Sequence, residues 1–222
     1  GDDVNGTYST GGYATYLLGG LQENYYYGIR RYPYCTDMSK NPLTFKDIDP
    51  LQISPHSGVP MNPIFGGFNP LDAAEVHSQG EVWCAMLWEA RASLVRKHGY
   101  SVGNQLILQI VTDGMKLSPP NPNFLQGRDA IVQADIVNTG GQNWNELWAA
   151  FAKRGMGFSA FSPPSSSTFG VIEAFDLPDA LLIVPTTGFL SSGPEHGPLA
   201  PACKTYTLTN HSTFPFAWTA RV

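Results

Sequence analysis

The sequence predicts a mainly α-helical protein whose helices pack as a bundle, with a short β segment near the C-terminal end. Three observations favour this fold class. Apolar residues recur at helical spacing between Leu71 and Arg154, and Gly or Pro marks the ends of these stretches. Two short alternating stretches follow after residue 204. The 222 residues suffice for one good core and a smaller appendage.

The longest predicted helix runs from Val76 to His98. Its apolar residues recur mostly at helical spacing and predict a single buried stripe. They are Val76, Trp83, Leu87, Ala90, Leu94 and Val95. Asp72, followed three residues later by Glu75, is a candidate N-cap in a loose capping box. Gly99 is the expected stop signal.

Three further helices are predicted, at residues 106–117, 124–137 and 143–154. The first ends at Pro119-Pro120, the second follows Pro122 and closes at Gly140-Gly141, and the third ends at Gly155. Their connections are short, which favours antiparallel packing into a compact bundle.

The remaining stretches define the predicted domain organisation. Residues before about 70 are rich in Pro and Gly and are expected to form loops with short ordered pieces. Residues 205–210 and 214–219 are predicted strands, and two strands alone do not make a stable domain. We therefore expect a helical subdomain at 1–178, a Pro-, Gly- and Ser-rich linker at 179–204, and the beginning of a β-sandwich at 205–222.

Composition excludes some classes of function. The formal net charge of −5 argues against nucleic acid as a partner, because such proteins need a basic surface. No apolar run approaches the roughly 20 residues of a membrane span. Only 14% of the residues are charged, against about 25% in typical domains, which suggests an extracellular type of surface. A zinc hydrolase needs two His at i, i+4 and a third ligand, and no His-Glu-x-x-His motif accompanies the histidines His56, His77, His98, His196 and His211.

Three segments carry a resemblance to a known family. They are Gly28-Ile-Arg-Arg-Tyr-Pro-Tyr34, Glu75-Val-His-Ser-Gln-Gly-Glu-Val-Trp83, and a longer set of short matches between Asp113 and Gly157. In order and spacing, residues 28–178 resemble the C-terminal half of the fungalysin family of secreted zinc endopeptidases. From about Pro185 onward, the sequence resembles the start of an immunoglobulin-like module.

The resemblance implies a fold, a cofactor and a partner. The helical bundle would be similar to the C-terminal subdomain of thermolysin-like peptidases. The full-length enzyme would be extracellular, would bind zinc and would hydrolyse peptide bonds in proteins. Its His-Glu-x-x-His helix and its Glu ligand would belong to the N-terminal half of the same precursor. We therefore expect no zinc site within these residues.

The resemblance also assigns roles to His77 and Asp72. In the family, the histidine matching His77 lines the cleft and donates a hydrogen bond to the developing oxyanion. The aspartate five residues earlier, here Asp72, would fix the tautomer of the imidazole. From the residues alone, a histidine near a helix start such as His77 is more often structural than functional. Asp72 is equally well explained as a helix cap. Glu75 competes with Asp72 for either role.

Arg30 and Tyr32 are the predicted substrate-binding residues. An arginine in the matching region of thermolysin-like enzymes binds a substrate carbonyl through its rigid set of donors. Tyrosine rings between residues 25 and 34 have apolar faces and polar tips suited to a peptide cleft. Surface salt bridges and packing within a loop explain the same residues without substrate.

Three interpretations remain open. The chain is a segment of a metalloendopeptidase that is inactive alone, or one chain of a processed two-chain enzyme. Alternatively, it is a non-catalytic structural or adhesive extracellular protein derived from a peptidase. The first of these is the leading interpretation; the absence of zinc ligands together with the Tyr-rich surface of low charge is the reason to consider the last.

Overall fold

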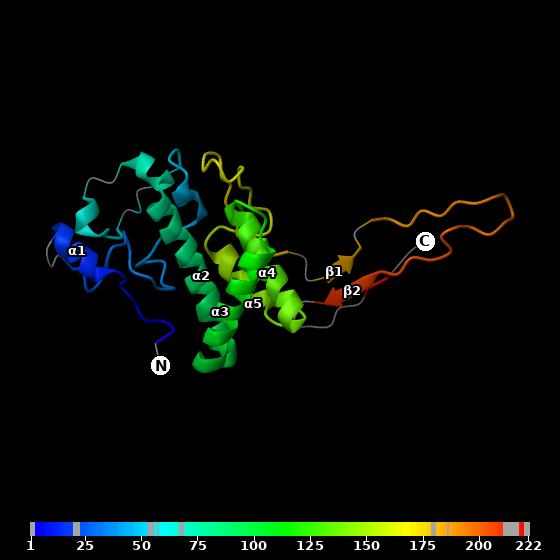
Figure 1. The fold of residues 1–222 in the computed structure, drawn as a ribbon, viewed down its shortest axis with the longest axis horizontal. Coiled ribbons are helices and arrows are strands. Elements are labelled where there is room, and N and C mark those ends of the chain that lie inside the picture. The colour runs from blue at the N-terminus through cyan, green and yellow to red at the C-terminus, as the bar shows by residue number, and fades with distance from the viewer. Residues whose placement is uncertain are drawn as a thin grey trace. The chain divides into compact units, whose positions relative to one another are not determined.

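The computed structural model describes residues 3–19, 23–52, 56, 58–66, 69–178, 181–185, 187–210 and 218–219. The chain divides into two compact units, Gly1–Leu177 and Pro178–Val222. The first unit contains the helices, and the second contains a pair of strands (Figure 1). The predicted fold class, mainly α with a short β segment near the C-terminal end, is confirmed.

The helices α2 to α5 build the first unit. They span Val76–His98, Tyr100–Leu117, Phe124–Thr139 and Trp144–Lys153. Helix α2 packs against α3 and α5, and α4 packs against α3 and α5 (Figure 1). These pairings give the bundle that short connections favour.

Local signals explain the ends of two of these helices. The N-cap of α4 is a capping box, in which Asn123 accepts from the backbone N–H of Gln126 and the Gln126 side chain accepts from the backbone N–H of Asn123. Gly140 closes α4 in the left-handed region, with φ of 73°. Helix α2 ends at Gly99, and its last turn carries basic residues that complement the helix dipole.

Helix α3 begins six residues earlier than the predicted 106, at Tyr100. Gly99, with φ of 79°, lets the chain turn directly from α2 into α3. A Cβ atom at Gly103 would collide with the carbonyl oxygen of Leu94, so glycine is what allows α3 to lie this close to α2. The first turns of α3 are held against α2 by close backbone packing rather than by large side chains. They therefore lack an apolar stripe.

Replacing Gly103 by alanine is expected to lower the free energy of unfolding by about 1–3 kcal/mol, because the helices must separate to admit the methyl group. This loss outweighs the roughly 1 kcal/mol by which alanine favours a helix over glycine. Urea denaturation measures the effect. Gly80→Ala in α2 is the matched control, since nothing lies within 4 Å of its added Cβ, and it should stabilise the protein. A Gly103→Ala protein as stable as the wild type would contradict the close packing.

Short helices precede the bundle. They are α1 at Gly12–Gly19 and the 3₁₀ turns η1 at Phe45–Ile48, η2 at Pro63–Phe65 and η3 at Pro70–Ala74. The turn η1 is an integral part of the core, because Phe45 and Ile48 are buried with α2 residues such as Met86. The ring of Phe45 lies 5.7 Å from that of Phe124 in α4. The loop-rich N-terminal region thus packs onto the bundle.

The second unit contains an antiparallel pair of strands. Strand β1, Leu181–Val184, pairs with β2, Thr207–Asn210, so that Leu181 lies opposite Asn210. Strand β2 falls in the stretch predicted as the first strand. Strand β1, however, lies inside the predicted linker 179–204, which corrects that prediction. The Pro- and Gly-rich composition of this segment favoured a linker, although the segment contains a run of four apolar residues that can pair as a strand. Most of the predicted strand 214–219 lies outside the described residues.

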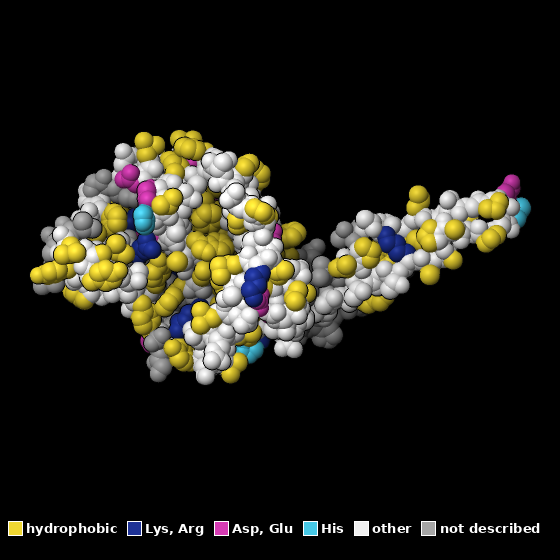
Figure 2. Space-filling model, viewed as in Figure 1, with side chains coloured by type: hydrophobic (Ala, Val, Ile, Leu, Met, Phe, Trp, Pro, Cys, Tyr) yellow, Lys and Arg dark blue, Asp and Glu magenta, His cyan; other side chains and the backbone are white. Residues whose placement is uncertain are grey.

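The surface fits the composition. On the face shown in Figure 2, charged side chains are few and scattered among hydrophobic and uncharged ones. Among the described residues, no helix has the length and the apolar character that crossing a membrane requires.

Candidate functional site

The first turn of α2 presents His77 to solvent. Its imidazole is 78% exposed and is anchored by Glu75, whose Oε1 lies 2.7 Å from Nδ1. Glu75 is also the N-cap of α2, and its Oε2 accepts from the backbone N–H of His77 at 2.8 Å and of Ser78 at 3.3 Å. One carboxylate therefore caps the helix and orients the imidazole.

This arrangement favours the charged form of Glu75. The His77 side chain, followed by the backbone N–H groups of His77 and Ser78, holds the pKa of Glu75 below its usual value. Because the folded-state pKa is lowered, the stabilisation is present above the unfolded value and is lost as the pH falls through the folded one. Glu75 is thus an anion at neutral pH.

Arg30 lies beside His77, although the two are 47 residues apart in sequence. Its Nη1 donates to the carbonyl oxygen of His77 at 3.4 Å. Its Nε is buried and has no hydrogen-bond partner among the described residues. The structure therefore brings two of the predicted site residues, Arg30 and His77, to the same place, and the guanidinium retains donors for a ligand.

A buried ion pair fixes this juxtaposition. Arg31 Nε lies 2.9 Å from Glu81 Oε2, and both side chains are almost completely buried. Glu81 Oε1 also accepts from the backbone N–H of Tyr32 at 2.9 Å, and Arg31 donates to the carbonyl oxygen of Ser78. Glu81 lies one helical turn after His77, so it ties residues 31–32 to the start of α2. Sequence inspection assigned no role to this pair.

Tyr32 does not have the predicted surface position. Only 5% of the residue is exposed, and it belongs to the hydrophobic core. Burial raises the pKa of Tyr32 to about 12, so its hydroxyl stays protonated. Its backbone is held by Glu81 and its ring packs edge-on to His56. The prediction of Tyr32 as a substrate contact is therefore corrected: the ring faces inward because the Arg31–Glu81 pair sets the direction of the chain.

Asp72 does not contact the imidazole. Its carboxylate accepts from the backbone N–H of Asn69 and forms the capping box of η3. Glu75 takes both roles that the sequence offered to Asp72, as the cap of α2 and as the partner of His77. The turn η3 explains this outcome, because it places Asp72 before a separate helical turn rather than at the start of α2.

The geometry defines what the site can do. With Nδ1 of His77 bonded to Glu75, a neutral imidazole presents Nε2 as an acceptor, whereas an imidazolium presents it as a donor. An exposed donor of this kind, on a residue whose backbone carbonyl accepts from Arg30, suits binding of an oxygen that carries or develops negative charge.

The described residues do not fit a metal centre. Among them, no three or more His, Cys, Asp or Glu side chains are grouped so that they could hold a metal ion. His77 and Glu75 are a pair without a third ligand, and a zinc site needs at least three protein ligands.

Curated proteins similar to this chain are fungal enzymes. The extracellular metalloproteinase MEP of Neosartorya fischeri is 40% identical over 158 residues, which cover 65% of this chain and 22% of the relative. The extracellular metalloproteinase 1 of Trichophyton rubrum is 38% identical over 166 residues, which cover 69% of this chain and 23% of the relative. The chain thus spans less than a quarter of the length of these relatives.

A family model gives the same assignment. The model of the fungalysin metallopeptidases (M36) matches residues 4–160, more than half of the chain. This match contains residues 28–34 and 75–83 and the pairs Arg30–His77 and Arg31–Glu81, so the resemblance noted in the sequence is confirmed. The chain therefore belongs to the fungalysin (M36) family of metallopeptidases.

Proposed function

We propose that this chain is part of a secreted, zinc-dependent metalloendopeptidase that hydrolyses peptide bonds in proteins. The observation that carries this proposal is the exposed imidazole of His77, which is held by Glu75, together with the hydrogen bond from Arg30 to the backbone carbonyl of His77. The names of the similar fungal proteins, extracellular metalloproteinases, support the activity and the extracellular location. The His-Glu-x-x-His motif is missing from this sequence, so the zinc ligands belong to another part of the polypeptide and this chain alone is inactive.

In this proposal, His77 stabilises the transition state. Zinc, when bound by the rest of the enzyme, polarises the substrate carbonyl and activates water. The residues of this chain do something different: Nε2 of the protonated His77 ring donates to the oxygen on which charge develops, and Glu75 holds the orientation of the ring through Nδ1. Arg30 binds a backbone carbonyl of the substrate and positions the peptide.

Replacing His77 by alanine in the complete enzyme is expected to lower kcat by about 10²–10³-fold, with little change in KM, because the lost hydrogen bond is made mainly in the transition state. Steady-state hydrolysis of an internally quenched peptide measures both constants. His196→Ala is the matched control, since that side chain is 91% exposed and its nearest acidic partner is an equally exposed glutamate. It should leave both constants unchanged.

A second variant separates the proposed role from a structural one. Glu75→Gln keeps a hydrogen-bonding group beside Nδ1 of His77 but weakens the charge-assisted contact that orients the ring, so kcat should fall, though less than in His77→Ala, while KM stays unchanged. An unchanged kcat in His77→Ala would refute the role of His77. A complete polypeptide without His-Glu-x-x-His would refute the enzyme and favour the structural or adhesive alternative.

A further inference from the structure

The Arg30 side chain has few contacts of its own. It donates to the carbonyl oxygen of His77 at 3.4 Å, which is close to the upper limit for a hydrogen bond, and its buried Nε has no partner among the described residues. A guanidinium held this loosely takes its position mainly from the backbone that carries it. The donors that Arg30 offers to a ligand are therefore placed by whatever fixes residues 28–31.

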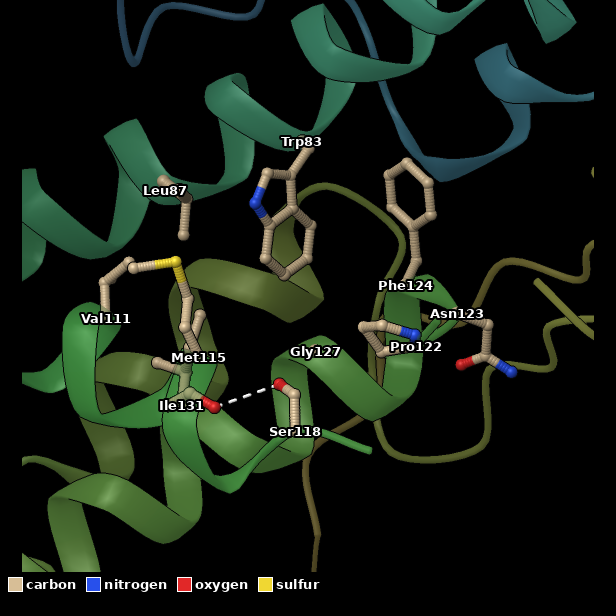
Figure 3. Close-up of a pocket in the computed structure, with 11 residues that line it drawn as sticks. Trp83, Leu87, Val111, Met115, Ser118, Pro122, Asn123, Phe124, Gly127 and Ile131 are labelled. Carbon is tan, nitrogen blue, oxygen red and sulfur yellow. Dashed lines mark hydrogen bonds between the residues drawn. The ribbon is translucent and has the colours of Figure 1, made fainter. Parts of the chain in front are cut away.

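The apolar pocket of the helical bundle does not provide this support. It has a volume of about 320 Å³ and is walled by Trp83, Met115 and Phe124 (Figure 3). All of its lining residues belong to the helices α2, α3 and α4 or to the connection between α3 and α4, so residues 28–31 do not reach it. The backbone around Arg30 is held by the neighbouring loops instead.

Asn62 holds this backbone. Its side-chain Nδ2 donates to the carbonyl oxygens of Gly28 and Arg30, each at 3.0 Å, and its backbone N–H donates to the carbonyl oxygen of Arg31 at 2.9 Å. One residue thus fixes three of the four carbonyl groups in residues 28–31. Because Asn62 is only 1% exposed, water does not readily replace these hydrogen bonds when they are lost.

The amide of Asn62 also caps a helical turn. Both Nδ2 hydrogens go to the carbonyl oxygens of residues 28 and 30, while Oδ1 accepts from the backbone N–H of Ile64 at 3.2 Å and caps η2. Among side chains of this length, only asparagine combines two donors with an acceptor, since aspartate supplies acceptors alone. The residue type therefore suits a clamp and a cap together.

A contact with Thr10 limits the movement of the same segment. The backbone N–H of Ile29 donates to the carbonyl oxygen of Thr10 at 2.8 Å, and a Cβ atom at Gly28 would collide with that oxygen. Gly28 has φ of 61°, which favours glycine. Without Asn62, the segment stays attached at Thr10 but loses the contacts at Arg30 itself. The expected result is a displaced Arg30 rather than an unfolded loop.

The loop that carries Asn62 is anchored beside the same segment. The Tyr27 hydroxyl donates to the carbonyl oxygen of Pro60 at 3.1 Å. The hydrogen bonds of Asn62 described above all end in residues 28–31 or in its own turn, and none joins two helices of the bundle. Loss of the Asn62 side chain should therefore displace Arg30 more than it weakens the core.

We propose that Asn62 is a positioning residue for substrate binding: it holds the backbone of residues 28–31 so that the Arg30 guanidinium meets a backbone carbonyl of the peptide. This inference rests on the proposed function, in which Arg30 binds the substrate. Because Asn62 is buried, it acts through Arg30 and not by direct contact with the peptide. A displaced binding group of this kind weakens substrate binding and leaves the chemical step intact.

Steady-state kinetics of the complete enzyme with an internally quenched peptide test the proposal. Arg30→Met should raise KM about 10–100-fold, since it removes a charged donor. Asn62→Ala should raise KM about tenfold and change kcat by less than about twofold, because the guanidinium is displaced but present. The double variant should have the KM of Arg30→Met alone, because Asn62 acts through Arg30. Multiplied effects on KM, or a normal KM in Asn62→Ala, would overturn the proposal.

Asn143→Ala is the matched control, because it removes a comparable set of buried hydrogen bonds elsewhere. Asn143 is also 1% exposed, its Nδ2 donates to Asp135 at 2.7 Å, and its Oδ1 lies 2.6 Å from Nε2 of His98. The variant should lower the midpoint of thermal unfolding, as Asn62→Ala does, but leave KM unchanged. An equal rise of KM in both variants would assign the effect to a general loss of stability and refute the positioning role.

Asn62→Asp keeps the test decisive if Asn62→Ala fails to fold. A carboxylate retains the acceptor for the backbone N–H of Ile64 and so caps η2, but it offers no donor to the carbonyl oxygens of Gly28 and Arg30. KM should rise at least as much as in Asn62→Ala. A folded Asn62→Asp enzyme with normal KM would contradict the proposal.

The variants separate this inference from the proposed function. A KM that rises in Arg30→Met but not in the Asn62 variants would refute the positioning role and leave the proposed function standing. An unchanged KM in Arg30→Met would show that Arg30 does not bind the substrate, and the role of Asn62 would fall with it. The role of His77 is tested separately, through kcat of His77→Ala.

Discussion

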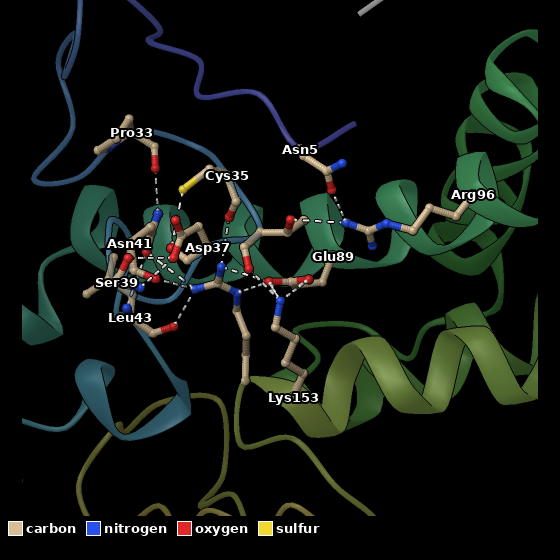
Figure 4. A network of polar contacts seen from close by, with 12 residues as sticks. Asn5, Pro33, Cys35, Asp37, Ser39, Asn41, Leu43, Glu89, Arg96 and Lys153 are labelled. Carbon is tan, nitrogen blue, oxygen red and sulfur yellow. Dashed lines mark hydrogen bonds and ion pairs between the residues drawn. The ribbon is translucent and has the colours of Figure 1, made fainter. Parts of the chain in front are cut away.

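Replacing Arg154 by methionine is expected to lower the free energy of unfolding by about 3–5 kcal/mol, because it leaves a buried carboxylate without its main partner. The Arg154 guanidinium is completely buried at the end of α5 and pairs with Glu89 of α2, with Nη2 to Oε1 at 2.8 Å. Glu89 lies in the same polar network as Cys35, Asn41 and Leu43 (Figure 4). Arg154 also donates to the carbonyl oxygens of Cys35, Asn41 and Leu43. A single side chain therefore joins the N-terminal loops to two helices.

Chemical denaturation of the purified chain measures this effect. Arg154→Lys should recover only part of the stability, since an ammonium cannot reach three carbonyl oxygens and a carboxylate with the same geometry. Arg96→Met is the matched control, because Arg96 is exposed, and it should change the stability by no more than about 0.5 kcal/mol. The double variant Arg154→Met, Glu89→Met should be less destabilised than Arg154→Met alone. Additive losses would contradict a coupled ion pair.

Replacing Glu81 by alanine is expected to have an effect of similar size, about 3–5 kcal/mol, and to disturb the candidate site as well. The Glu81 carboxylate is the acceptor for both the Arg31 side chain and the Tyr32 backbone N–H, and these groups are buried. Without it, both donors lose their partner inside the protein. Residues 30–32 then lose their attachment to the first turns of α2, and the contact between Arg30 and His77 loosens. In the complete enzyme of the proposed function, we expect KM for a peptide substrate to rise along with the loss of stability.

Conservative and surface variants separate these two consequences. Glu81→Gln still accepts from the Tyr32 backbone N–H but loses the charge, so it should retain more of the substrate affinity than Glu81→Ala. Glu146→Ala removes a carboxylate that pairs with Lys97 near the surface, and it should have a small effect on unfolding and none on KM. A stable Glu81→Ala protein with normal KM would show that the Arg31–Glu81 pair does not hold the site together.

Short-range features of the fold were predictable from the sequence. The long helix begins at Val76 and ends at His98 as the apolar stripe and Gly99 indicate, and α4 begins after its Asn123 cap. The start of α3 was not predictable from periodicity, because a glycine contact with the backbone of α2 replaces an apolar stripe there. Strand β1 was not predicted either. Its partner β2 lies more than 20 residues away, so no local pattern shows that the two pair.

For the candidate site, the amino-acid sequence by itself determined the family, through ordered short motifs, and the position of His77 at the start of the long helix, through the apolar stripe. Only the tertiary structure decided that Glu75 rather than Asp72 holds the imidazole, that Arg30 lies beside it, and that Tyr32 faces the core. The physical reason is that caps and periodicity are encoded within a few residues. By contrast, the Arg31–Glu81 pair joins residues 50 apart, and forms only once the loops have packed onto α2.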